Sequence, residues 1–111
     1  MTTSIDERWL TALSDWARGE PSVLKAWVFG SRAKGSARQE SDLDVAVFLE
    51  SEDRTVQVEW ILNARTWASE AQSQVGAFPK IDLQLADPEC DEVVWPAVQE
   101  HGIPFYEKNY T

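Results

Sequence analysis

Apolar residues recur along the chain with two spacings, one typical of helices and one typical of strands. In residues 5–17 they return every three or four positions, which predicts an amphipathic helix. Ser4 and Glu7 form a capping-box pattern at its start, in which each side chain accepts a hydrogen bond from the other residue's backbone amide. Gly19 follows its end. Residues 23–29, Val-Leu-Lys-Ala-Trp-Val-Phe, predict a strand.

Two further segments alternate apolar and polar positions, as strands do. In residues 42–49 the apolar side chains take every second position, which leaves Asp42 and Asp44 together on the opposite face. Residues 80–86 alternate in the same way and place Asp82 on the side away from its apolar neighbours. The carboxylates of both predicted strands therefore lie on their polar faces.

A longer helix is predicted between these two strands. Glu52 and Asp53 suit its first turn, because carboxylates favour the positive end of a helix dipole. Gly76 follows its end. An amphipathic pattern marks the side expected to be buried, with the positions Val58, Ile61, Leu62, Arg65 and Ala68.

The C-terminal part predicts a last helix and a short edge strand. Asp87 and Pro88 are typical of a helix start, an N-cap followed by proline at the first helical position. Gly102 ends this helix, and His101 before it suits the negative end of the dipole, so we expect a structural role for this histidine. Residues 103–106 predict the edge strand, where a proline is tolerated. The order of elements indicates an α/β fold in a single domain, residues 1–111.

Length and charge exclude several classes of function. A chain of 111 residues buries one modest core and leaves little room for a second substrate-binding domain. The net charge of −9 argues against direct nucleic-acid binding, which needs a basic face. Cys90 is the only cysteine, so no internal disulfide can form, which suits the cytoplasm. The acidic N-terminal residues fit no signal peptide, and no apolar run approaches the roughly 20 residues of a membrane span.

One turn combines the features of a phosphate site. Residues 30–35 read Gly-Ser-Arg-Ala-Lys-Gly directly after the first predicted strand. Gly30 allows a sharp turn and a close approach of the backbone to a ligand, and a helix that opens here points free amides at an anion. Ser31 adds a hydroxyl, while Arg32 and Lys34 offer positive charge. Taken alone, the motif also fits a plain turn between a strand and a helix.

Three aspartates supply candidate metal ligands. Asp42 and Asp44 lie on one strand face, where their like charges repel in the absence of a cation. Mg²⁺ relieves this repulsion and prefers carboxylate and phosphate oxygens. If the two later strands are neighbours, Asp82 lies beside the pair, and three carboxylates can hold two metal ions roughly 3.5–4 Å apart. Each aspartate taken alone also fits a solvated position on an exposed strand.

In combination these motifs are more specific. The patterns Gly-Ser-x-x-x-Gly at residues 30–35 and Ser-Asp-Leu-Asp at residues 41–44, with Asp82 on a later strand, resemble the active site of the DNA polymerase beta-like nucleotidyltransferase superfamily. In detail they are similar to the minimal nucleotidyltransferases, and the resemblance covers nearly the whole chain. It implies the polymerase beta-like nucleotidyltransferase fold, a small mixed β-sheet flanked by helices.

The resemblance also implies a reaction and a role for each motif residue. The expected reaction is in-line attack of a hydroxyl on the α-phosphate of ATP with release of pyrophosphate, in which positioning and charge neutralisation supply most of the rate. Residues expected to contact the nucleotide are Gly30, Ser31, Arg32 and Lys34. Those expected to bind two Mg²⁺ ions and to form the catalytic centre are Asp42, Asp44 and Asp82, with Asp82 as general base.

The acceptor has to come from another molecule, because the chain offers no second domain to hold it. By the resemblance, it is a HEPN-type ribonuclease toxin that is silenced by adenylylation of a tyrosine, so that this chain acts as the antitoxin of a HEPN/MNT toxin–antitoxin pair. Two alternatives stay open: an antitoxin that neutralises by binding alone, and a nucleotidyltransferase that modifies a small molecule such as an aminoglycoside, with a homo-oligomer forming the cleft. The sequence leaves the nucleotide preference and the oligomeric state undecided.

Overall fold

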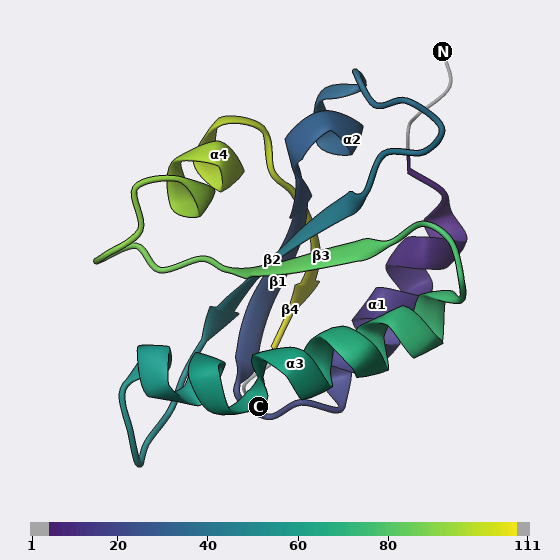
Figure 1. Cartoon of the computed structure of the whole chain (residues 1–111). Coiled ribbons are helices and arrows are strands. Elements are labelled where there is room, and N and C mark those ends of the chain that lie inside the picture. Colours follow the sequence, from purple (N-terminus) through teal and green to yellow (C-terminus); the bar gives the residue numbers. More distant parts are fainter. Residues whose placement is uncertain (1–4, 109–111) are drawn as a thin grey trace.

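The computed structural model describes residues 5–108, which form a four-stranded mixed sheet with helices on both faces (Figure 1). The strand order is β3-β2-β1-β4, with β1 antiparallel to both β2 and β4 and with β2 parallel to β3. Along the chain the elements are α1 (Glu7–Arg18), β1 (Val23–Phe29), α2 (Gly30–Lys34), β2 (Leu43–Leu49), α3 (Val56–Val75), β3 (Ile81–Leu85), α4 (Val94–His101) and β4 (Ile103–Glu107). The predicted α/β fold with a small mixed sheet is confirmed.

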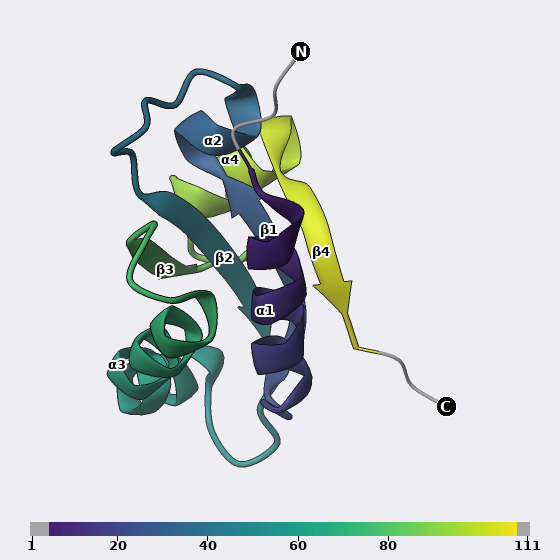
Figure 2. The same ribbon diagram turned by 90° about the vertical axis from the view of Figure 1, so that its right-hand side faces the viewer.

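The two faces of the sheet pack against different helices. Helices α1 and α3 lie side by side on one face, the α1/α3 face, and enclose the main core (Figures 1 and 2). On the other face, the α4 face, Val98 of α4 packs on Ala46 of β2 and beside Trp27 of β1. Helices α2 and α4 both gather at the end of β1 (Figure 1). Two segments far apart in the sequence, α2 and α4, therefore lie close together near the end of β1.

The alternation predicted for the strands is present in the structure. Leu43, Val45 and Val47 of β2 are fully buried on the α1/α3 face, while Asp44 lies between them on the α4 face. Asp42 directly precedes β2, and β3 is slightly shorter at each end than the predicted strand. Strand β4 forms an edge of the sheet and contains Pro104, as expected for a proline in a strand.

Helix α1 begins later than the capping-box pattern predicts. Its N-cap is Asp6, whose carboxylate accepts a hydrogen bond from the backbone amide of Arg8 at 2.8 Å. Ser4 lies outside the described residues. An aspartate caps at least as well as a serine, so Asp6 can start the helix without the more distant pair.

The predicted start and buried side of α3 are wrong. The N-cap is Thr55, whose hydroxyl accepts a hydrogen bond from the amide of Val58, and not the acidic pair before it. Three residues of the predicted apolar side are exposed instead, by 42% at Val58, 75% at Ile61 and 60% at Leu62. Trp67 packs in the core in their place, because an indole buries more apolar area than an aliphatic side chain.

Helix α4 begins at Val94 and not at the predicted Asp87-Pro88 pair. Asp87 instead accepts a hydrogen bond from the amide of Glu89, two residues on, which is the geometry of an Asx turn. The carboxylate of Asp91 accepts three hydrogen bonds, each of 2.8 Å, from the backbone amides of Val93, Val94 and Trp95. The helix ends at His101, with Gly102 as the predicted terminator.

Within residues 5–108, no helix combines the length and the apolar character that crossing a bilayer requires.

Candidate active site

The turn after β1 requires a glycine at its first position. Gly30 has a backbone φ of +73°, a region that residues with a side chain rarely adopt. A Cβ atom there would lie 2.1 Å from Oδ2 of Asp44, which is far inside contact distance. Helix α2 starts at this glycine without a side-chain cap, and Gly35, also at positive φ, ends it. The backbone of the predicted phosphate turn therefore lies directly against Asp44, one of the candidate metal ligands.

A histidine holds the amide of this glycine. The backbone N–H of Gly30 donates a hydrogen bond of 2.9 Å to Nε2 of His101, which lies at the end of α4, 71 residues further along the chain. The sequence indicated only a helix-terminal role for His101, because nothing in the local pattern shows a contact between such distant segments. Ser31, the next residue of the turn, is half-buried.

The structure brings the three aspartates of the sequence motif together. Strands β2 and β3 are parallel neighbours, and Asp44 pairs with Asp82 in their register. The pKa of Asp44 is raised to about 6, first by burial and then by the negative charges of Asp82 and Asp42 and a hydrogen bond to Asp82. Because like charges gather in a partly buried place, this cluster favours a proton or a cation over bare carboxylates.

The carboxylates fit a hard cation by their chemistry, although the cluster is not arranged around one. Asp82 accepts a hydrogen bond of 2.8 Å from the side-chain amide of Gln84, which fixes one of its oxygens. In the part of the chain that the structure describes, no three His, Cys, Asp or Glu side chains already form a group able to hold a metal ion. A bound Mg²⁺ would be held by Asp42, Asp44 and Asp82, whose oxygen-only donor set is the kind that Mg²⁺ prefers.

Arg32, which the motif predicts to contact the nucleotide, is engaged by other parts of the protein in this structure. Its side chain is only 6% exposed, and its guanidinium donates hydrogen bonds to the backbone carbonyls of Gln39 and Ser41. The guanidinium also lies 5.1 Å from the ring centroid of Trp9 and 5.8 Å from that of Phe78, in cation–π geometry. A cation engaged on all sides is not free for phosphate, so Arg32 instead ties the turn to the loop that leads into Asp42.

Lys34, the second predicted cation of the turn, is exposed on α2. Its position leaves the ammonium group in solvent, where a flexible side chain can reach an anion without losing other contacts.

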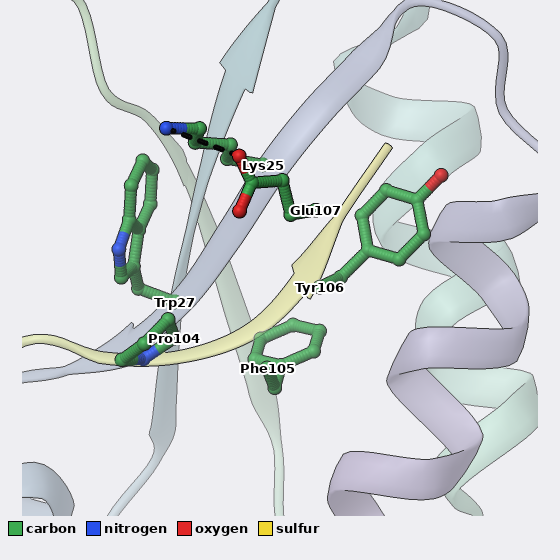
Figure 3. A pocket seen from close by; sticks show the side chains of 6 residues that line it. All are labelled: Lys25, Trp27, Pro104, Phe105, Tyr106 and Glu107. Atoms are coloured by element: carbon green, nitrogen blue, oxygen red, sulfur yellow. Dashed lines mark ion pairs between the residues drawn. The ribbon is translucent and has the colours of Figure 1, made fainter. Parts of the chain in front are cut away.

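A shallow pocket of about 350 Å³ lies over β1 and β4, apart from the aspartates (Figure 3). Lys25 and Glu107 form an ion pair of 3.5 Å at its edge. The ring of Trp27 stands over Pro104 in the same pocket (Figure 3) and packs edge-on against Trp95 of α4. Because Phe29 pairs with Asp44, Trp27 lies on the same face of the sheet as the carboxylates.

Comparisons with known proteins agree with this fold. The model of the family described as "Polymerase beta, Nucleotidyltransferase" matches residues 12–111. A comparison with proteins of curated function gives no match. The chain is similar in structure to a toxin–antitoxin crystallised with AMP-PNP, with a TM-score of 0.64 and 19% identity over 90% of this chain and 74% of that one.

Two further solved structures have the same fold. A mutant of the toxin–antitoxin MntA-HpeT gives a TM-score of 0.61 and 17% identity over 95% of this chain and 76% of that one. A putative nucleotidyltransferase from Sulfolobus solfataricus gives 0.51 and 15% identity over 97% and 90%. These TM-scores establish the fold, and the family model covers nearly the whole sequence. The chain therefore belongs to the polymerase beta nucleotidyltransferase family.

Proposed function

We propose that this protein is a Mg²⁺-dependent protein adenylyltransferase that moves AMP from ATP to a hydroxyl, expected to be a tyrosine, on a HEPN-type ribonuclease toxin, and so acts as an antitoxin in the cytoplasm. The observation that carries the proposal is the contact between the turn and the carboxylates. Gly30 leaves no room for a side chain beside Asp44, and Asp44 pairs with Asp82 across two strands. This contact supports the proposal, because phosphoryl transfer requires phosphate-binding and metal-binding groups side by side.

Each residue of the site has a role in this mechanism. The turn that Gly30 and Ser31 form binds the β- and γ-phosphates of the nucleotide, and Lys34 adds positive charge from solvent. Asp42, Asp44 and Asp82 would hold Mg²⁺, which would supply positive charge against the triphosphate and the leaving pyrophosphate. Asp82 accepts the proton of the attacking hydroxyl, and its hydrogen bond to Gln84 orients the accepting carboxylate.

A toxin as acceptor is supported by two observations. The similar structures include toxin–antitoxin complexes, one of which contains the nucleotide analogue AMP-PNP. The net charge of −9 is complementary to a ribonuclease, because an RNA-binding protein requires basic residues. The HEPN class of the toxin and the tyrosine acceptor follow from the resemblance of the motifs to the minimal nucleotidyltransferases.

The test is transfer of label from ATP to the co-purified or co-expressed toxin. Wild-type protein with Mg²⁺ and α-labelled ATP is expected to label the toxin, whereas Asp42→Asn should lose the label and the protection of cells. Asp53→Asn, which changes another exposed carboxylate, in the loop before α3, is the matched control and should behave as wild type. Full protection of cells by Asp42→Asn at normal expression would overturn the catalytic proposal.

A second candidate, neutralisation by binding alone, is favoured by one observation. Val58, Ile61 and Leu62 form an exposed apolar strip on α3, which is the kind of surface that docks to another protein. In this case Asp42→Asn would keep its protection, while Ile61→Asp would lose it. The two variants therefore separate catalysis from docking.

A further inference from the structure

His101 is placed beside the phosphate turn by the path of the chain. It ends α4, and the next residue turns the chain directly into β4, which pairs with β1 through Val28 and Ile103. A Cβ atom at Gly102 would lie 2.6 Å from the carbonyl oxygen of Val98, so only glycine allows this tight return. The imidazole consequently lies next to Gly30, the residue that directly follows β1.

The peptide between Phe29 and Gly30 is held from two sides. Its N–H donates to Nε2 of His101 at 2.9 Å, and the Cα of Gly30 lies against the carboxylate of Asp44. A rotation of this peptide would break the hydrogen bond and would turn the following amides of the turn in a new direction. The orientation of the turn thus depends on a side chain outside the sequence motif.

The hydrogen bond also defines the state of the imidazole. Nitrogen Nε2 can accept from an N–H only when it carries no proton, so the neutral ring has its proton on Nδ1. Nδ1 is buried, and no described residue provides it with a hydrogen-bond partner. A buried polar atom without a hydrogen-bond partner lowers stability. This cost argues that the histidine has a role beyond the packing of α4.

We propose that His101 is a positioning residue for nucleotide binding: it fixes the peptide plane before Gly30, so that the amides from Ser31 onward face the phosphates. The inference rests on the proposed function, since it names a further residue of the same site. His101 itself touches neither the nucleotide nor the metal; it acts through the backbone of Gly30.

The experiment measures binding of Mg²⁺ with AMP-PNP by calorimetry, and binding of Mn²⁺ alone by electron paramagnetic resonance. His101→Ala should weaken AMP-PNP binding by about three- to tenfold, the range that loss of one hydrogen bond to a backbone amide produces, and leave Mn²⁺ affinity within about twofold. His101→Gln, which retains an acceptor, should restore most of the affinity. Glu100→Ala, on the exposed side of the same helix turn, is the control and should bind as wild type.

The Gly30 amide provides a direct readout. Its ¹⁵N–¹H resonance should move in His101→Ala and return toward the wild-type position in His101→Gln. Equal affinity of wild type and His101→Ala for AMP-PNP would overturn the inference and leave the proposed function intact. The inference would also be overturned if nucleotide affinity, Mn²⁺ affinity and melting temperature all fell in His101→Ala and His101→Gln restored none of them. His101 would then have a purely structural role.

Failure of the wild-type protein to bind AMP-PNP would overturn the proposed function, and the inference with it. If His101→Ala does not fold, His101→Leu decides the same question, because leucine keeps most of the side-chain volume and offers no acceptor.

Discussion

Strand β2 has opposite properties on its two faces. Leu43, Val45 and Val47 are fully buried under α1 and α3, where each contributes about 1.5–3 kcal/mol of hydrophobic stabilisation. Asp44 lies on the α4 face of the same strand, where burial first and the charges of Asp82 and Asp42 second raise its pKa to about 6. The comparison teaches that one face stabilises the domain, while the other holds an arrangement that is unfavourable until a cation binds.

The largest effect should come from the α1/α3 face, at a position remote from the turn. Leu49→Ala removes a side chain that is 2% exposed, and we expect a loss of about 3 kcal/mol in the free energy of unfolding. Urea unfolding measures it. Leu62→Ala, on the exposed strip of α3, is the control and should change stability by about 0.5 kcal/mol or less. A similar loss in both variants would contradict the assignment of the two surfaces.

Gly30→Ala should damage the α4 face and largely spare the core. The new Cβ would meet Asp44 at 2.1 Å, and the resulting displacement of ligand and turn should lower AMP transfer by about a hundredfold. Gly35→Ala is a close control, because Gly35 also has a positive φ but has nothing within 4 Å of its Cβ position. Both variants should lose about 1–3 kcal/mol of stability through backbone strain, and only Gly30→Ala should lose the activity.

Asp44→Asn should make the metal-free protein more stable. The folded-state pKa of Asp44 is raised, so its ionised form opposes folding above about pH 6, and the wild type regains stability as the pH falls through that value. At pH 7 in EDTA the gain should be about 1 kcal/mol, a figure reduced for the partial exposure of the side chain, and it should shrink below about pH 6. A clear drop in melting temperature, with Asp53→Asn unchanged, would show that Asp44 has a structural role.

The smallest effect concerns the support of α4. Burial raises the pKa of Asp91, but hydrogen bonds from the amides of Val93, Val94 and Trp95 outweigh it and hold the pKa below its ordinary value. Its contribution is therefore complete at neutral pH and is lost as the pH falls below about 3.9, the ordinary value for aspartate. Asp91→Ala should cost about 0.5–1 kcal/mol at pH 7 in urea unfolding, and the difference should narrow in acid. Glu92→Ala, an exposed neighbour, should have no such pH-dependent effect.

Sequence patterns predict the strands of this protein well, because successive side chains of a strand alternate between its two faces. The period of two in β2 and β3 is enough to place Asp44 and Asp82 on the same face once the strands are parallel neighbours. Helix α3 defeats the same reasoning, since it has apolar residues on more than one side. Only the rest of the fold determines that Trp67 turns inward and Ile61 outward.

The start of α4 and the roles of Arg32 and His101 were beyond the local pattern for different reasons. Both Asp87-Pro88 and Asp91 are possible starts of the same helix. The helix begins after Asp91, because its carboxylate accepts hydrogen bonds from three backbone amides of the first turn. Arg32 is recognisable as a charge in the motif, but its partners come from loops and helices elsewhere in the chain. His101 meets Gly30 across 71 residues. Contacts between segments so far apart in the sequence form only in the folded chain, so no local pattern predicts them.

The space beside Gly30 also constrains how this gene can change. Every single-base substitution in a glycine codon that alters the amino acid introduces a residue with a Cβ atom, and here that atom would collide with the Asp44 carboxylate. No single-base change to another amino acid is conservative here, so one mutation at this codon is enough to disrupt the site. Regaining it requires a change back to glycine at the same codon.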